Sequence, residues 1–339
     1  MNPFEQLTNL ASKPMEAASR ALTRPSTSGR HRPLYGLNVL DLLRGGNLED
    51  AVRDRIIMIT GASSGIGAAA ALQIGAAGGE VVLVARGKEK LDETAAAVRQ
   101  AGGRAHVYPC DLSDLDAIAV MAAQALADLG RIDILVNNAG RSIRRSLELS
   151  YDRMHDYQRT MQLNYFAPVA LMLALLPGMR ERKFGHVINI SSVGVQTRVP
   201  RFGAYIASKA ALDTLCDAWQ AETHDEHVRF TTVHMALVRT PMIEATTIYD
   251  KFPALTPEDA ASVISEAIIH RPRRVSPPFG QVAAFADAVS PQIMDRVRSR
   301  GFHLFGDSKA AKGEQPTDER EGVTTEGRLF AEVTRGVHW

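Results

Sequence analysis

Short apolar runs alternate with longer Ala- and Leu-rich stretches along most of the chain. Six runs, from Ile56 onward, have this character: "IIMIT", "VVLVA", "HVYPC", "IDILVN", "HVINIS" and "FTTVHM". Uninterrupted Val, Ile and Leu are typical of strands that are buried on both faces between helices. Repeated strand–helix units of this kind predict an α/β fold with a parallel, doubly wound sheet and right-handed crossovers.

The same pattern divides the chain into a central domain and two tails. It continues without a clear linker between residues 51 and 305, which predicts a single domain. Residues 1–50 and 306–339 are more polar, and we expect both extensions to be partly disordered or loosely packed. Within the first, Leu34–Leu43 is apolar enough for a short helix that docks on the core or on a partner. Residues 11–33 resemble an organelle transit peptide in composition, although a disordered tail is the favoured interpretation.

Charge and cysteine content narrow the possible partners and compartments. The 39 basic and 38 acidic residues nearly cancel, so no global field favours nucleic acid. Cys110 and Cys216 fit a reducing compartment, and we expect a cytoplasmic protein. Neither cysteine belongs to a Cys/His cluster, so no metal site is expected. The longest apolar run, Phe166–Met179, is too short to span a bilayer and predicts a buried helix, while peripheral membrane contact stays open.

A glycine-rich segment follows the first predicted strand and opens a helical stretch. In "TGASSGIG", Thr60–Gly67, the glycines Gly61, Gly65 and Gly67 permit a tight turn and a close approach of the backbone to a ligand. The free N–H groups of the following helix would face the pyrophosphate of a dinucleotide. An ordinary strand–helix turn is the alternative, but the position between strand and helix favours dinucleotide binding.

The ends of the next two strands suggest which dinucleotide is bound. An NAD-preferring site would place an acidic residue after the second strand, whereas this chain has Arg86 there. A guanidinium can pair with the 2′-phosphate of NADPH, although a solvated arginine is the alternative. Asp111, at the end of the third strand, could accept a hydrogen bond from the adenine amino group. It could equally cap a helix, a role for which Asp114 competes.

Four motifs together make the chain resemble the short-chain dehydrogenase/reductase family. "TGASSGIG", "NNAG", "NISS" and "YIASK" occur in the order and spacing of that family, over roughly residues 53–280. The resemblance implies a Rossmann-type fold, a homo-oligomer, and a catalytic set of Asn164, Ser192, Tyr205 and Lys209. It also implies that the cofactor is bound by Gly61, Ser63, Ser64, Gly65, Ile66, Gly67, Arg86, Asp111, Leu112, Asn138, Ala139, Gly140, Tyr205, Lys209, Val238 and Thr240.

The chemistry of this set follows from the residue types. Tyr205 and Lys209 lie four positions apart on one helix face. The ammonium, together with an oxidised nicotinamide, should lower the pKa of the phenol below its usual value near 10, so that it can act as a general acid or base. Ser192, thirteen positions before Tyr205, fits the family spacing better than Ser191. Asn164 matches the asparagine that supports a water-mediated proton relay in the family.

One segment departs from the family pattern. After the sixth strand, Met235 and Ala236 stand where the family usually has Pro-Gly, which puts the local shape of the loop in doubt. Val238 and Thr240 still match positions that contact the nicotinamide carboxamide in the family.

Further segments resemble the bacterial fatty acyl-CoA reductases of wax-ester synthesis, which belong to lipid metabolism. "NNAGRSIRRSLE", "DYQRTMQLNYF", "LVRTPMI", "PEDAA", "RPRRV" and "GFHLF" carry this likeness, which runs from about Asp50 to the final "HW". It implies NADPH-dependent reduction of a long-chain fatty acyl-CoA to an aldehyde, and leaves open a further reduction to alcohol. Two alternatives remain: a general carbonyl reductase of aldehydes, ketones or 3-oxoacyl groups, and a non-catalytic NADP-binding sensor.

The loop after the fourth strand carries three arginines without a nearby acid. Arg141, Arg144 and Arg145 lie in "GRSIRRS", beyond the carboxyl end of a strand, where ligands of doubly wound folds bind. Arginine suits phosphate recognition, so these residues are candidates for binding the phosphates of coenzyme A. A solvated charged loop is the alternative.

Overall fold

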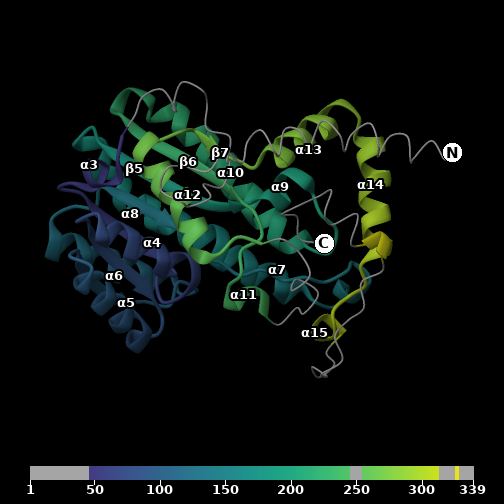
Figure 1. The fold of residues 1–339 in the computed structure, drawn as a ribbon, viewed down its shortest axis with the longest axis horizontal. Helices are drawn as coiled ribbons and strands as arrows, with labels where there is room; N and C mark the ends of the chain where they lie inside the picture. The colour runs from purple at the N-terminus through teal and green to yellow at the C-terminus, as the bar shows by residue number, and fades with distance from the viewer. Residues whose placement is uncertain (1–45, 245–253, 313–324, 328–339) are drawn as a thin grey trace.

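A seven-stranded parallel sheet runs through the protein in the order β3-β2-β1-β4-β5-β6-β7 (Figure 1). The computed structural model describes residues 46–244, 254–312 and 325–327. The strands are β1 (Ile56–Thr60), β2 (Glu80–Ala85), β3 (Arg104–Pro109), β4 (Ile134–Asn137), β5 (Gly185–Ser192), β6 (Val228–Met235) and β7 (Arg274–Val275). The doubly wound, Rossmann-type fold expected from the sequence is therefore confirmed, and it forms a single domain.

All six apolar runs became strands. β1 and β5 are buried along their whole length, as expected for strands covered on both faces. β7 was not predicted, because a two-residue strand, Arg274–Val275, is too short to show any periodicity. It pairs with Thr232 and Val233 of β6 and ends the sheet on that side.

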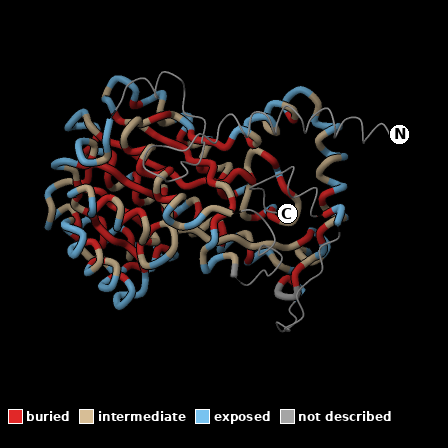
Figure 2. Tube along the Cα trace, viewed as in Figure 1, coloured by how far each residue is buried: buried red, intermediate tan, exposed pale blue. Residues whose placement is uncertain are grey.

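Helices cover both faces of the sheet. One core cluster joins β1 residues such as Ile57 and Ile59 to helices on one face, and the other joins Met58 to helices on the opposite face. The first face carries α4 (Gly65–Ala76), α5 (Lys88–Gln100) and α12 (Pro257–His270), and the second carries α6 (Leu115–Leu129), α8 (Ala167–Glu181) and α10 (Gly203–Glu222). Figure 2 shows the buried strands enclosed by helices that are exposed only on their outer sides.

The apolar run Phe166–Met179 forms most of α8, and the prediction of a buried helix is confirmed. α8 continues α7 (Met154–Met161) and η2 (Gln162–Phe166), so the helical run Met154–Glu181 is long and apolar enough to cross a membrane by length and composition. Its residues Leu171, Met172 and Leu175 are nevertheless buried against the sheet and the neighbouring helices. In this fold it is a core helix.

Packed residues extend beyond the predicted bounds of the domain at both ends. α3 (Leu48–Val52) lies partly in the expected N-terminal extension, yet it packs on the core through Leu48, Ala51 and the buried Val52. At the other end, Phe305, Ser308 and Ala311 are buried, so the chain up to residue 312 is part of the domain. The packing of the C-terminal end depends on hydrogen bonds from Arg144 and Arg145 of a distant loop, which the polar composition of the segment does not indicate. The predicted helix Leu34–Leu43 and the segment 11–33 lie outside the described residues.

Most of the remaining elements lie near the carboxyl end of the sheet or follow β7 in the chain, whereas η3 immediately precedes β6. Two helices after β7 form an arm that projects from the body at the side opposite α5 and α6 (Figure 1). This arm consists of α13 (Pro278–Val289) and α14 (Pro291–Leu304), and the short elements are η1 (Glu148–Ser150), α9 (Val193–Thr197), η3 (His224–Glu226), α11 (Pro241–Glu244) and α15 (Lys309–Lys312).

Candidate active site

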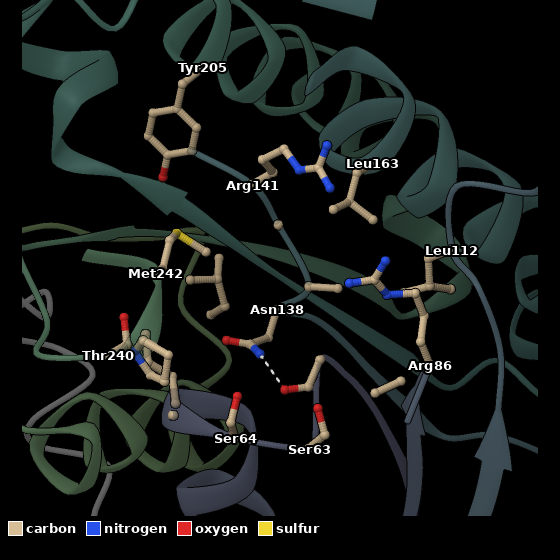
Figure 3. A pocket seen from close by; sticks show the side chains of 18 of the residues that line it. Ser63, Ser64, Arg86, Leu112, Asn138, Arg141, Leu163, Tyr205, Thr240 and Met242 are labelled. Atoms are coloured by element: carbon tan, nitrogen blue, oxygen red, sulfur yellow. Dashed lines mark hydrogen bonds between the residues drawn. The ribbon is translucent and has the colours of Figure 1, made fainter. Parts of the chain in front are cut away.

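A cavity of about 1120 Å³ opens at the carboxyl ends of the strands, beside the point where the strand order reverses between β1 and β4. This is where ligands bind in open parallel sheets. Figure 3 shows Arg86, Ser63 and Ser64 at one end of the cavity and Tyr205 at the other, with its hydroxyl pointing inward. The cavity thus has an elongated lining suited to an extended dinucleotide.

The glycine loop brings two strand ends closer than any side chain would allow. Gly61 has a φ of +67°, and a Cβ there would lie 3.0 Å from the Cα of Ala139. A Cβ on Gly67 would lie 2.3 Å from the carbonyl oxygen of Gly61. The N-cap of α4, Ser64, makes no capping hydrogen bond with its side chain, so the first N–H groups of the helix remain available to a ligand. The loop therefore fits the pyrophosphate of a nicotinamide dinucleotide.

A threonine and an asparagine fix the glycine loop against the loop after β4. The hydroxyl of Thr60 accepts hydrogen bonds from the backbone N–H groups of Asn138 and Ala139, both at 3.0 Å. The side-chain amide of Asn138 donates back to the carbonyl of Thr60 at 2.9 Å. These bonds hold Asn138, Ala139 and Gly140 at the cavity wall, where the family resemblance expects them.

Arg86 and Asp111 both line the end of the cavity that lies far from Tyr205. Asp111 is exposed and accepts two hydrogen bonds from Ser113, one from its backbone and one from its hydroxyl, and these lower the pKa of the Asp111 carboxyl. Asp114, rather than Asp111, caps α6 through the N–H groups of Asp116 and Ala117. The capping alternative for Asp111 is thereby removed. Arg86 is exposed at the end of β2, and Leu112 is buried beside it.

Tyr205 and Lys209 face the cavity from the first turns of α10. The Lys209 ammonium donates a 2.7 Å hydrogen bond to the carbonyl of Ile190 in β5. Burial lowers the pKa of Lys209 to about 8, against the opposing charge of Asp213. Burial raises the pKa of Tyr205 to about 12; a hydrogen bond with Ser192 acts in the lowering direction and Asp213 in the raising direction.

The pKa of Tyr205 is raised in this structure, whereas the sequence analysis expected it to be lowered. That expectation combined Lys209 with the positive charge of an oxidised nicotinamide, and the chain alone supplies only the ammonium. In the protein by itself, desolvation of the phenolate outweighs every favourable contact. The high pKa keeps Tyr205 protonated at neutral pH, which is the form that a proton donor requires.

The two candidate serines at the end of β5 have different partners. The Ser192 hydroxyl accepts a hydrogen bond from the N–H of Gly194 at 3.0 Å and interacts with Tyr205. Ser191 donates to the carboxylate of Asp213 at 2.8 Å. Both line the cavity, but it is Ser192 whose hydroxyl is hydrogen-bonded with the phenol of Tyr205. The geometry therefore favours Ser192 for polarising a carbonyl group.

Asn164 lies in the π-helical turn η2, an irregularity that the sequence did not predict. Its side chain is fully buried and holds the loop after β4 through two bonds to the backbone of Arg141, one accepted from the N–H at 2.8 Å and one donated to the carbonyl at 2.9 Å. It also donates to Ser208 of α10 at 3.0 Å. Asn164 thus joins the loop at Gly140 to the helix that carries Lys209.

Asp213 was missed by the sequence analysis. It continues the face of α10 that carries Tyr205 and Lys209, because the three residues are spaced four apart. Ser191 and His234 are cross-strand neighbours on β5 and β6, and both reach the same carboxylate oxygen, with His234 Nε2 at 3.2 Å. The other ring nitrogen of His234 lies 2.8 Å from the Ser276 hydroxyl. From the sequence, a charged residue one helix turn after Lys209 is most simply placed on the solvent-exposed face of the helix. Only the fold shows that Asp213 is enclosed.

The three arginines after β4 divide between the cavity and the C-terminal segment. Arg141 lines the cavity (Figure 3). Arg144 donates to the carbonyl of Gly306 at 2.7 Å, and Arg145 bonds the carbonyl of Ala311 and the carboxylate of Asp156 at 3.2 Å. The latter two arginines therefore anchor the C-terminal segment, which the sequence could not show. Binding of coenzyme A phosphates by this group stays a prediction, and the geometry favours it for Arg141 alone.

The segment after β6 keeps its place despite the departure at Met235 and Ala236. Val238 pairs with Leu255 in an isolated parallel bridge, and the N–H of Leu255 donates to the carbonyl of Leu237 at 2.8 Å. Val238 and Thr240 both line the cavity, Thr240 close to the glycine loop. The unusual residues thus leave the cavity wall continuous.

Comparison with known proteins agrees with this geometry. Residues 55–249 match the short chain dehydrogenase family. An uncharacterized oxidoreductase of Mycobacterium tuberculosis is 65% identical over 98% of both chains. A fatty acyl-CoA reductase of Acinetobacter baylyi is 48% identical over 85% of this chain and 96% of its own.

Solved structures give the same result. A metagenomic short-chain oxidoreductase in complex with NADP is 36% identical, with a TM-score of 0.56, over 64% of this chain and 92% of its own. A short-chain dehydrogenase of Streptomyces avermitilis is 33% identical, with a TM-score of 0.62, over 73% and 97%. With the glycine loop, the catalytic face of α10 and the sheet order in agreement, this chain belongs to the short-chain dehydrogenase/reductase family of nicotinamide-dependent oxidoreductases.

Proposed function

We propose that this protein reduces long-chain fatty acyl-CoA thioesters to fatty aldehydes with NADPH. The observation that carries the proposal is the 48% identity to a fatty acyl-CoA reductase over nearly the whole of that protein. It is supported by a cavity in which Ser192, Tyr205 and Lys209 converge. A likeness that extends beyond the catalytic core favours a shared substrate more than a likeness of the cofactor site alone would.

The choice of NADPH rests on the end of β2. Arg86 lines the cavity near Ser63 and Ser64, and β2 ends at Ala85 without an acidic residue that would repel a 2′-phosphate (Figure 3). Arginine is suited to phosphate recognition because its planar fork offers several donors. A relative of known structure was solved with NADP, which is consistent with this choice.

The residues of the site account for the chemistry of thioester reduction. The bound cofactor supplies a hydride to the carbonyl carbon. Ser192 and Tyr205 would donate hydrogen bonds to the carbonyl oxygen and stabilise the negative charge that develops there. Tyr205 then gives its proton to this oxygen, which yields a hemithioacetal. Return of that proton to the tyrosinate lets the oxygen re-form the C=O bond and expel coenzyme A as a thiolate, which takes a proton from solvent. The products are the aldehyde, the oxidised cofactor and the thiol of coenzyme A.

Lys209 and Asn164 support the proton donor. Lys209 is held by the carbonyl of Ile190, and its positive charge stabilises the tyrosinate that remains after proton transfer. Asn164 orients the loop at Arg141 beside this lysine. This mechanism requires no thiol nucleophile. Cys110 and Cys216 would be poor nucleophiles, because both are buried and burial raises the pKa of both thiols, that of Cys216 to about 12.

A steady-state assay that compares palmitoyl-CoA with decanal tests the proposal. Wild-type enzyme should reduce palmitoyl-CoA, and Tyr205→Phe should lower kcat by about 10²–10⁴-fold because the general acid is lost. The matched control is Tyr108→Phe, which removes only a hydroxyl bonded to exposed Asp128 and should leave kcat unchanged.

Three results would contradict parts of the proposal. An enzyme that reduces decanal but not palmitoyl-CoA would be a general carbonyl reductase. Substantial turnover by Tyr205→Phe would refute the mechanism. The same assay with NADH should be at least tenfold slower, and equal rates with both cofactors would refute the role of Arg86.

A further inference from the structure

The outward face of α13 is apolar. Val282, Phe285 and Val289 repeat at helical spacing, and 65%, 72% and 69% of their surfaces are exposed. Ile293, at the start of α14, is 59% exposed and lies in the same projecting arm. None of the exposed residues of α13 is charged: they are Pro278, Gln281, Val282, Phe285, Ala288 and Val289.

The inward face of α13 holds the one charged residue of the helix. Asp287 is 5% exposed and forms ion pairs with Arg198 and Arg298. Arg298 also donates to the carbonyl of Thr197 at 2.9 Å. These contacts fix the rotation of the helix, so its apolar face cannot turn inward without separating a buried carboxylate from two arginines. The arrangement is the reverse of an ordinary surface helix.

The exposed apolar area of the arm has the size of a functional surface. Fully exposed side chains of this size present roughly 150–200 Å² each, so the four exposed fractions amount to roughly 450 Å². An exposed apolar patch of about 300–600 Å² is in the range that marks functional surfaces.

The shape and charge of the arm fit a lipid surface. α13 and α14 project from the body, and Figure 2 shows exposed residues along their outer side. Arg296 is exposed and follows Ile293 at a spacing of three along α14, while the neighbouring Asp295 is paired with Arg298. An apolar helix face with an exposed arginine beside it fits the composition of helices that lie in the interface of a bilayer.

We propose that α13 and the start of α14 form a docking surface for anionic phospholipid membranes. Phe285 and its apolar neighbours would enter the boundary between headgroups and acyl chains, and Arg296 would face the phosphates. α13 packs closely on α9, which follows Ser192: a Cβ on Gly280 would lie 2.8 Å from a methyl carbon of Val193. Docking would therefore hold the catalytic side of the domain at the membrane. The proposal does not depend on which substrate is reduced.

Co-sedimentation of the full chain with vesicles tests this proposal. Wild-type protein should bind vesicles of phosphatidylglycerol and phosphatidylcholine, and binding to pure phosphatidylcholine should be weaker. Val282→Gln/Phe285→Gln/Val289→Gln should lower the partition coefficient at least about a hundredfold, since burial of each such side chain shifts an equilibrium about tenfold. The control is Val120→Gln on α6, which removes an equally exposed valine, 71%, outside the arm. In the absence of vesicles, reduction of whichever of palmitoyl-CoA and decanal the wild type turns over should be unchanged in both variants.

A second variant keeps the test decisive if the triple variant fails to fold. Phe285→Trp retains the apolar face, and its fluorescence should shift to the blue on addition of anionic vesicles. An unshifted spectrum, or wild-type protein that stays in the supernatant, would overturn the proposal. A triple variant that only changes the mass measured by light scattering would also overturn it and would identify a contact between copies.

Discussion

At the scale of single residues, burial and charge act on Tyr205 and Lys209 from several sides. Burial disfavours both the phenolate and the ammonium, so it raises the pKa of Tyr205 to about 12 and lowers that of Lys209 to about 8. The negative charge of Asp213 raises both values. Asp213 is therefore a positioning residue that keeps Lys209 protonated, and it also holds the end of β5 through Ser191.

The first prediction concerns Asp213→Asn. Loss of the negative charge should lower the pKa of Lys209 further below its usual value, so Lys209 loses its proton at lower pH. The pH profile of kcat/KM for NADPH reports the ionisation of the free enzyme, and its basic limb should move to lower pH. At pH 8, kcat/KM should fall on the order of a few-fold. The charged or titratable groups around Asp213 are Tyr205, Lys209, Cys216, His234 and Arg273.

Asp217→Asn is the matched control, because Asp217 lies one turn further along α10, is 41% exposed and pairs with Arg273 and Arg274. Its pH profile should stay that of the wild type. If Asp213→Asn reduces thermal stability while its profile coincides with that of the control, Asp213 has only a structural role.

At the scale of the elements, Asp156 connects α7 to the loop that borders the cavity. Its side chain is 2% exposed and pairs with Arg145 of the loop at 3.2 Å, and with Arg153 and Arg159 of its own helix region. Burial raises the pKa of the Asp156 carboxyl, but the hydrogen bond from Arg159 and the three positive charges outweigh it, so the pKa is lowered. The ionised carboxylate therefore stabilises the folded state.

The second prediction follows from this ion-pair cluster. Asp156→Asn should lower the free energy of unfolding by about 2 kcal/mol at pH 7, because a buried carboxylate with charged partners is lost. A lowered pKa means that this contribution is present above the usual carboxyl pKa of 3.8 and is lost as the pH falls below it. Urea titrations at pH 7 and pH 3 measure the difference. Asp152→Asn, an exposed neighbour, is the control, and equal losses in the two variants would refute the role of Asp156.

The elements also show how far the sequence could predict the site. The strands and the glycine loop were predictable because continuous apolar runs and obligatory glycines are local signals. Ser192, Tyr205 and Lys209 line the cavity, and Asn164 lies behind its wall, beside Gly140 and Lys209. The π-helical turn at Asn164, the enclosure of Asp213 and the anchoring role of Arg145 depend on partners distant along the chain. A local sequence pattern does not indicate contacts with residues that are distant along the chain.

At the scale of the whole molecule, the C-terminal segment is joined to the active-site loop through a buried arginine. Arg201 is 5% exposed, lies 3.2 Å from the carboxylate of Asp307, donates to the carbonyl of Phe302 and stacks on its ring at 3.9 Å. Its own carbonyl accepts from the N–H of Arg145, and the N–H of Ser146 donates to Asp307. Residues far apart in sequence therefore form one unit beside the cavity.

The last prediction is that Asp307→Ala weakens both the fold and substrate binding. The substitution leaves the Arg201 guanidinium and the N–H of Ser146 without their shared acceptor, and breaking a buried ion pair costs about 3 kcal/mol. Urea unfolding should show this loss, and KM for the acyl-CoA should rise because the loop that carries Arg141 is no longer held from its far side. Asp295→Ala in α14 removes a carboxylate that is 74% exposed and should change neither quantity. A loss of stability with an unchanged KM would show that the C-terminal segment stabilises the fold without positioning the loop, and the coupling inferred here would be wrong.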